Sequence, residues 1–322
     1  MSICLSCNDL HVSFNLPEYS AKAVRGVSFD IPDRRTIGIV GESGCGKTMT
    51  ALSLMRLVPE PYGRIDKGSI IFEGKDILRL NKSELRALRG GRISMIFQDP
   101  MTSLNPLYTC GNQIREMLLH HKTINKNEIE PQILHLFEEV GISDPKRTFT
   151  SYPHQLSGGM RQRVMIAMAL SCSPHLLIAD EPTTALDVTV QAKILDLLHT
   201  LQQTKDMSMV IITHNLGIVG DIAHQVMVMY GGEVMEFAPV SSLFDSPAHP
   251  YTKSLLDTIP HIDNKKSRLN VIPGEVPTLQ NIPSGCPFHP RCGSATDRCR
   301  KEHPPLYSIG PEHTTRCFLY DH

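Results

Sequence analysis

The fold is decided by one short stretch of the chain, Gly41-Glu42-Ser43-Gly44-Cys45-Gly46-Lys47-Thr48. An apolar run with Ile37, Ile39 and Val40 precedes it and a helical pattern follows it, which predicts a loop between a buried strand and a helix. In such a loop the backbone N–H groups close around phosphates, the lysine adds a point charge, and the threonine hydroxyl can reach Mg²⁺. We therefore expect a nucleotide to be bound here by Gly41, Ser43, Gly44, Gly46, Lys47 and Thr48.

Two adjacent carboxylates further along the chain narrow the class of nucleotide-binding protein to which it can belong. The apolar run Leu176-Leu177-Ile178-Ala179 predicts a buried strand that ends in Asp180-Glu181, and open α/β sheets bind their ligands at this end of their strands. We expect Asp180 to hold Mg²⁺, mostly through water, and Glu181 to polarise the attacking water. Such a pair is often only a helix N-cap, but the phosphate loop in the same chain favours the catalytic interpretation.

A second predicted anion site opens another helix, at Leu156-Ser157-Gly158-Gly159-Met160-Arg161-Gln162-Arg163. A serine and two glycines at a helix N-terminus present backbone N–H groups to an anion. One nucleotide needs only one such loop in its own domain. We therefore expect Ser157, Gly158 and Gly159 to contact ATP that is bound by a partner chain.

These residues resemble the ATP-binding cassette (ABC) family, whose signature is this LSGG stretch. The resemblance implies an α/β fold, a P-loop NTPase of the ABC type, with a mixed sheet core, an antiparallel β edge and a helical subdomain. It implies a nucleotide-binding domain at 1–260, with the helical subdomain at about 99–165, and a C-terminal extension at 261–322. The implied activity is ATP hydrolysis coupled to transmembrane transport.

The same resemblance assigns roles to single residues. It implies that Gln98 senses Mg²⁺ and contacts the membrane subunit, and that His214 touches the γ-phosphate. Asp187 would cross the dimer interface, and Phe14 would stack on adenine, with Tyr19 as the alternative. Without the other motifs, a histidine after a strand is more often a capping or surface residue, and a phenylalanine in a strand is more often core.

Composition and charge argue against several other classes of protein. Lys and Arg total 32 against 33 acidic residues, so the chain lacks the basic field that nucleic-acid binding relies on, and we expect no nucleic-acid partner. The N-terminus, Met1-Ser2-Ile3-Cys4, lacks the features of a signal peptide, and no apolar run is long enough to span a membrane. We expect a cytoplasmic protein, and the resemblance implies peripheral attachment at the cytoplasmic face of the inner membrane.

The last 62 residues have a different character, with eight prolines and few long apolar runs, which predicts a loop-rich extension. It contains Cys286, Cys292, Cys299 and Cys317. A cytoplasmic location disfavours disulfides, so four clustered thiols suggest a metal centre. Their spacing is looser than the paired C-x-x-C of zinc ribbons, so ordinary buried or free thiols remain the alternative.

Two further stretches resemble the tail of the dipeptide, oligopeptide and nickel importer subgroup. They are His249-Pro250-Tyr251-Thr252 and Pro287-Phe288-His289-Pro290-Arg291-Cys292. The resemblance implies a [4Fe–4S] cluster on the four cysteines, with zinc or no metal as alternatives. It implies peptide import, with nickel or a metal chelate as the alternative solute and a soluble, non-transport ABC ATPase as the alternative class. The implied partners are two transmembrane permease subunits, an extracytoplasmic solute-binding protein, and a second ABC ATPase subunit or a second copy of this chain.

One thiol lies within the phosphate loop itself. Cys45 precedes the predicted helix by two residues, and a helix N-terminus lowers the pKa of a thiol. We therefore expect Cys45 to be alkylated readily in the absence of nucleotide and to be protected by Mg-ATP.

Overall fold

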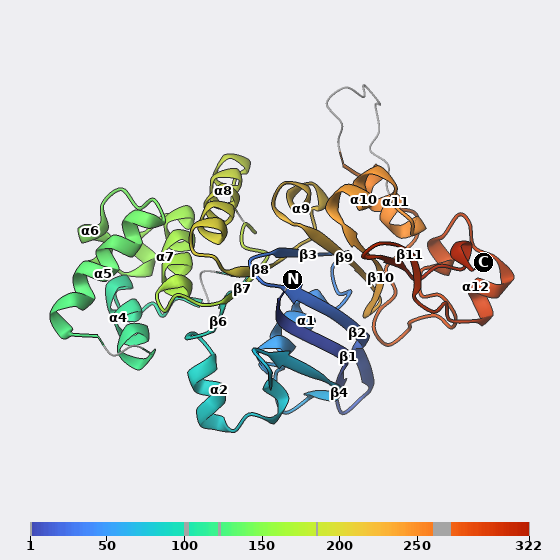
Figure 1. The fold of residues 1–322 in the computed structure, drawn as a ribbon, viewed down its shortest axis with the longest axis horizontal. Coiled ribbons are helices and arrows are strands. Elements are labelled where there is room, and N and C mark those ends of the chain that lie inside the picture. The colour runs from blue at the N-terminus through green and yellow to red at the C-terminus, as the bar shows by residue number, and fades with distance from the viewer. Residues whose placement is uncertain (1, 100–102, 122–123, 185, 260–271, 322) are drawn as a thin grey trace. The chain divides into compact units, whose positions relative to one another are not determined.

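The computed structural model describes residues 2–99, 103–121, 124–184, 186–259 and 272–321 (Figure 1). The chain forms two compact units. The first consists of Arg79–Ile211 together with Pro32–Arg35 and the residues up to Cys4. The second consists of Leu5–Ile31, Thr36–Leu78 and Ile212–His322.

A four-stranded sheet forms the N-terminal part of the second unit. Its strand order is β2-β1-β4-β5, and both β1 with β4 and β4 with β5 pair antiparallel. Alternate side chains of β1, such as Leu10 and Val12, are buried, as expected for strands with one face on a core. The predicted antiparallel β edge is therefore confirmed. The strands are β1 (Ile3–Asn15), β2 (Ser20–Pro32), β4 (Gly63–Phe72) and β5 (Lys75–Asp76).

The phosphate loop of the second unit follows β3 (Thr36–Val40), whose five residues are all buried. This strand pairs parallel with β9 (Gln225–Tyr230), which pairs antiparallel with β10 (Glu233–Pro239). Gly231 and Gly232 have φ of +57° and +84° and form the tight turn that their sequence predicts. The helices of this unit are α1 (Lys47–Leu54), α9 (Leu216–Ile222), α10 (Val240–Asp245), α11 (Pro250–Asp257) and α12 (Asp297–Lys301).

The first unit combines short parallel strands with a group of helices. Strand β6 (Ile93–Ile96) pairs parallel with β7 (Leu176–Asp180), and β8 (Ser208–Thr213) is the next strand beyond β7. The buried residues of α4 and α5, among them Ile114 and Ile133, repeat with helical spacing, as the predicted helical subdomain requires. The helices of this unit are α2 (Lys82–Leu88), α4 (Cys110–His121), α5 (Lys126–Glu139), α6 (Pro145–Thr150), α7 (Gly158–Leu170) and α8 (Val188–Thr204).

The described part of the C-terminal extension joins the second unit in two ways. Strand β12 (His313–Thr315) pairs antiparallel with β10, and β11 (Tyr307–Gly310) pairs with β12. The side chain of Phe288 is buried against Tyr230 and Tyr251, with ring centroids 5.3 and 5.1 Å away. The extension thus shares a hydrophobic core with β9 and α11. The boundary predicted at residue 260 falls on residues outside the described part of the chain, and the domain limits stay a prediction.

Candidate functional site

The phosphate loop of the second unit has a path that requires glycine. Gly41, Gly44 and Gly46 have φ of +151°, +77° and +104°, a region that side chains with a Cβ rarely adopt. A Cβ on Gly46 would lie 2.5 Å from the carbonyl oxygen of Ala23, and one on Gly41 would lie 2.2 Å from that of Met229. Ser43 and Gly44 are exposed. The loop therefore has the close-packed backbone that a phosphate site needs.

Carbonyl oxygens of the phosphate loop hold the side chain of its lysine in place. Lys47 is the first residue of α1, and its Nζ donates hydrogen bonds to the carbonyl oxygens of Gly41 at 2.7 Å and Glu42 at 3.0 Å. The side chain of Lys47 is buried. Thr48, the next residue, is half-buried in the first turn of α1. The two residues stand where the sequence predicts a phosphate contact and a Mg²⁺ ligand.

The structure contradicts the basis of the predicted reactivity of Cys45, which is a lowered pKa of its thiol. Cys45 is only 1% exposed, and burial raises the pKa of its thiol, although Lys47 opposes the shift. A helix N-terminus favours the thiolate, but desolvation of the buried sulfur disfavours it more strongly.

The carboxylates of the first unit lie at the end of β7, as predicted. Asp180 is the last residue of the strand and is 2% exposed. Glu181 follows with φ of +45°, an uncommon value for a residue with a side chain. Its Oε2 accepts hydrogen bonds from Gln98 Nε2 at 3.0 Å and Thr184 Oγ1 at 2.9 Å. The structure therefore brings together Gln98 and Glu181, which the sequence assigned separately.

The signature stretch caps a helix of the first unit. Ser157 is the N-cap of α7, and its Oγ accepts a hydrogen bond from the backbone N–H of Met160 at 3.4 Å. Ser157 and Gly158 are exposed, and Gly159 is half-buried. Asp187 caps α8 in the same way, because its Oδ1 accepts from the N–H of Val190 at 3.0 Å. These capping hydrogen bonds do not test the contacts that Ser157 and Asp187 are expected to make across a dimer interface. Those contacts stay predictions.

Two further predicted contacts lie in the second unit. His214 directly follows β8 and is exposed. Phe14 lies on β1 opposite Gly63 of β4 and is half-buried, whereas Tyr19 is 40% exposed. Both aromatic rings therefore have an accessible part, and the choice between Phe14 and Tyr19 for adenine stays open.

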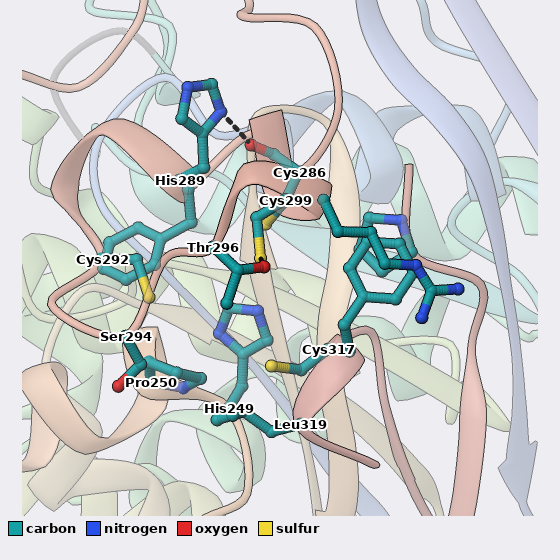
Figure 2. A pocket seen from close by; sticks show the side chains of 14 residues that line it. His249, Pro250, Cys286, His289, Cys292, Ser294, Thr296, Cys299, Cys317 and Leu319 are labelled. Carbon is teal, nitrogen blue, oxygen red and sulfur yellow. Dashed lines mark hydrogen bonds between the residues drawn. The ribbon is translucent and has the colours of Figure 1, made fainter. Parts of the chain in front are cut away.

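The four cysteines of the extension line one cavity of about 160 Å³. Figure 2 shows them around it, with Cys292 and Cys317 approaching from opposite sides. The remaining lining combines apolar side chains, such as Phe288, Phe318 and Leu319, with polar ones that include His249 and Arg298. Residues up to 31 positions apart in sequence thus converge, which the irregular spacing could not establish. The four cysteines are Cys286, Cys292, Cys299 and Cys317.

The surroundings of this cavity favour the protonated thiol over the thiolate at three of its four cysteines. Burial raises the pKa of the Cys286 thiol to about 12, and the other three cysteines add to the rise. Burial also raises the pKa of Cys292 and of Cys317. Four thiolates would therefore need compensating positive charge. In the part of the chain that the structure describes, no group of three or more His, Cys, Asp or Glu side chains is close enough to hold a metal ion as it stands.

A buried histidine also lines the cavity. The Nδ1 atom of His249 accepts a hydrogen bond from the N–H of Tyr251 at 3.0 Å, which starts α11. Burial lowers the pKa of His249 to about 3, with an opposing contribution from the backbone of Arg316, so the ring is neutral and carries its proton on Nε2. That Nε2 has no hydrogen-bond partner among the described residues.

Two contacts to the phosphate loop were missed from the sequence. The hydroxyl of Tyr251 accepts a hydrogen bond from the N–H of Glu42 at 2.9 Å, and Arg291 forms an ion pair with the Glu42 carboxylate. Both partners lie more than 200 positions from the loop, so no local pattern could have indicated them.

Comparison with known proteins agrees with these features. The chain matches the model of the family described as ABC transporter over residues 24–184 and that described as Oligopeptide/dipeptide transporter, C-terminal region, over residues 235–299. In the described residues no helix has the length and apolar character that crossing a bilayer requires.

Curated relatives match along almost the whole chain. The oligopeptide transport ATP-binding protein AppD of Bacillus subtilis is 49% identical over 100% of this chain and 98% of its own length. The dipeptide transport ATP-binding protein DppD of Escherichia coli is 46% identical over 97% of this chain and 95% of its own length.

A solved structure confirms the fold. The ATP-binding cassette MJ0796, a dimer in a post-hydrolysis state bound to ADP and Pi, has a TM-score of 0.66 and 25% identity, covering 73% of this chain and 98% of its own. The α/β fold of the ABC type predicted from the sequence is thus confirmed. The chain belongs to the ABC transporter family and carries the C-terminal region of its oligopeptide and dipeptide transporters.

Proposed function

We propose that this chain binds and hydrolyses ATP with Mg²⁺ to drive the import of peptides. The observation that carries the proposal is Glu181, a carboxylate placed after a buried strand and oriented by Gln98 and Thr184. A carboxylate fixed in this way can polarise a water for attack on the γ-phosphate. The phosphate loop supplies the other half of the chemistry, since it offers backbone N–H groups and Lys47 to the phosphates.

We infer that two ATPase chains together enclose each nucleotide. Lys47, Thr48, Gln98, Asp180, Glu181 and His214 would come from one chain, and Ser157, Gly158 and Gly159 from the other. The exposure of Ser157 at the start of a helix supports this arrangement, because an accessible helix N-terminus can accept a partner's phosphate. The dimeric state of the cassette MJ0796 supports it as well.

The proposed chemistry rests on position and charge. Thr48, Asp180 and Gln98 would hold Mg²⁺, and Glu181 would act on water. Binding of ATP would draw the two chains together, and loss of the γ-phosphate would release them. No covalent intermediate on the protein is required.

The proposed partners are two transmembrane permease subunits, an extracytoplasmic solute-binding protein, and a second ATPase subunit or a second copy of this chain. The chain would act peripherally at the cytoplasmic face of the membrane. Peptides are the proposed solute because the relatives that match over nearly the full length are named for oligopeptide and dipeptide transport. Nickel or a metal chelate is the alternative solute.

We further propose that Cys286, Cys292, Cys299 and Cys317 hold a [4Fe–4S] cluster. Their convergence on one cavity supports this, since four cysteine thiolates are the usual ligands of such a cluster. The buried Nε2–H of His249 could donate a hydrogen bond to a thiolate or a sulfide in this cavity. When bound, the cluster would supply the positive charge that keeps the four thiols ionised.

The experiment that tests the main proposal uses the importer assembled with its permease subunits. We expect Glu181→Gln to bind MgATP normally and to hydrolyse it at least about a hundredfold more slowly, which would also stop peptide uptake. Lys47→Ala is the matched control and should lose binding itself. Normal turnover by Glu181→Gln would refute the role of Glu181, and peptide uptake that is independent of this chain would refute the transport function.

A further inference from the structure

The C-terminal extension is tied to the phosphate loop by one ion pair within the second unit. Nη1 of Arg291 donates to Oε2 of Glu42 at 2.6 Å, and Nη2 donates to Oε1 at 3.0 Å. The side chain of Arg291 is 4% exposed and that of Glu42 is 25% exposed. Because the contact is bidentate and one partner is nearly buried, it fixes the direction of the carboxylate as well as its charge.

Arg291 is itself held firmly in the extension. Its Nε donates to the carbonyl oxygen of Pro273 at 2.9 Å, and its guanidinium carbon lies 5.8 Å from the centre of the Tyr230 ring. Gly274 has no side chain and so leaves room for that of Arg291, because a Cβ at this position would lie 3.2 Å from Cγ of Arg291. The hydrogen bonds to Glu42 hold the pKa of Arg291 above its ordinary value. The arginine therefore stays charged and has little freedom to leave the carboxylate.

Glu42 is fixed at three different atoms. Its N–H donates to the hydroxyl of Tyr251, its carbonyl oxygen accepts from Lys47, and its carboxylate is held by Arg291. Two of these three anchors come from residues that follow the cassette's last strand pair, β9 and β10, in the chain. The position of the second residue of the phosphate loop is thus set largely from the C-terminal side.

The charge of Glu42 gives this contact a consequence for nucleotide binding. Glu42 stands in a loop whose carbonyl oxygens hold Lys47, the residue expected to meet the phosphates. An uncompensated carboxylate beside a polyanion site repels the ligand, and the repulsion is weakened little in a partly buried place. The guanidinium of Arg291 neutralises that carboxylate and fixes its direction by holding both of its oxygens.

We propose that Arg291 is a positioning residue for ATP binding, which acts through Glu42 by orienting and neutralising the phosphate loop. The inference rests on the proposed function, namely that this loop binds MgATP. It makes the C-terminal extension part of the nucleotide site, because the extension supplies a charge that the loop lacks.

The test is the dissociation constant for MgATP of the full-length chain, measured by calorimetric titration. Arg291→Met keeps the length of the side chain and removes its charge, and we expect the dissociation constant to rise about tenfold. Adding Glu42→Gln to this variant removes the unpaired carboxylate, and we expect the constant to return to within about threefold of the original. A merely structural role of Arg291 would not predict this rescue.

Arg300→Met is the matched control, since Arg300 is exposed in the same extension and, among the described residues, is not a hydrogen-bond or ion-pair partner of Glu42. This substitution should leave the dissociation constant for MgATP unchanged. Unchanged binding by folded Arg291→Met, or a loss that Glu42→Gln fails to restore, would overturn the inference while leaving the proposed function intact. If Arg291→Met does not fold, Arg291→Lys with and without Glu42→Gln replaces it. Failure of the original chain to bind MgATP would overturn the proposed function together with the inference.

Discussion

Nε2 of Gln98 donates a hydrogen bond to Oε2 of Glu181 at 3.0 Å, although the two residues are 83 positions apart in the chain. The amide therefore occupies one lone pair of the carboxylate proposed to polarise water. Thr184 donates to the same oxygen at 2.9 Å, so two side chains fix the direction of this carboxylate. Movement of the segment that carries Gln98 would therefore change the orientation of Glu181.

The first prediction concerns this hydrogen bond. In Gln98→Ala the carboxylate of Glu181 loses a donor that orients it and Mg²⁺ loses one proposed ligand, so we expect turnover of ATP to fall about tenfold and by a larger factor than the affinity for MgATP. Phosphate release and nucleotide titration on the assembled importer measure the two quantities. Gln203→Ala, on the exposed face of α8, is the control and should behave like the original chain. Equal loss of affinity and turnover would contradict an orienting role.

The second prediction concerns the thiol in the phosphate loop. Because burial raises the pKa of Cys45, we expect iodoacetamide to modify it slowly in the folded chain with or without nucleotide, at pH 7 and still at pH 9. Mass spectrometry of the peptide that contains Cys45 measures the rate. The unfolded chain, in which the thiol is exposed, should be modified many times faster. Rapid labelling of the folded chain that Mg-ATP suppresses would restore the opposite interpretation.

Much of the cassette could be predicted because its signals are local. The strand before Gly41, the strand before Asp180 and the helix after Ser157 each combine an apolar run with characteristic residues a few positions away. Hydrophobic period and glycine chemistry fix such elements within a short window. The turn at Gly231-Gly232 followed for the same reason, since both residues need positive φ.

The contacts missed from the sequence depend on partners far apart in the chain. Arg291 meets Glu42 across 249 positions, and neither residue belongs to a pattern that requires the other. The buried state of Cys45 was missed for a related reason: it depends on packing within the second unit and not on the neighbouring helix. Sequence periodicity shows which face of an element is buried, but it does not show which polar side chains pair across the fold.

The third prediction concerns the cysteine cavity. A [4Fe–4S] cluster needs all four thiolates, so anaerobically purified chain should contain about four iron atoms with broad visible absorbance, and Cys317→Ser should lose most of both. Cys172→Ala is the control, because Cys172 belongs to the first unit and is not among the residues that line the cavity. Cys317→Ser should remain folded, since serine is nearly isosteric and the residue is only half-buried. Bound zinc without visible absorbance would replace the cluster by a single ion, and a metal-free chain with four titratable thiols would show that the cavity holds ordinary cysteines.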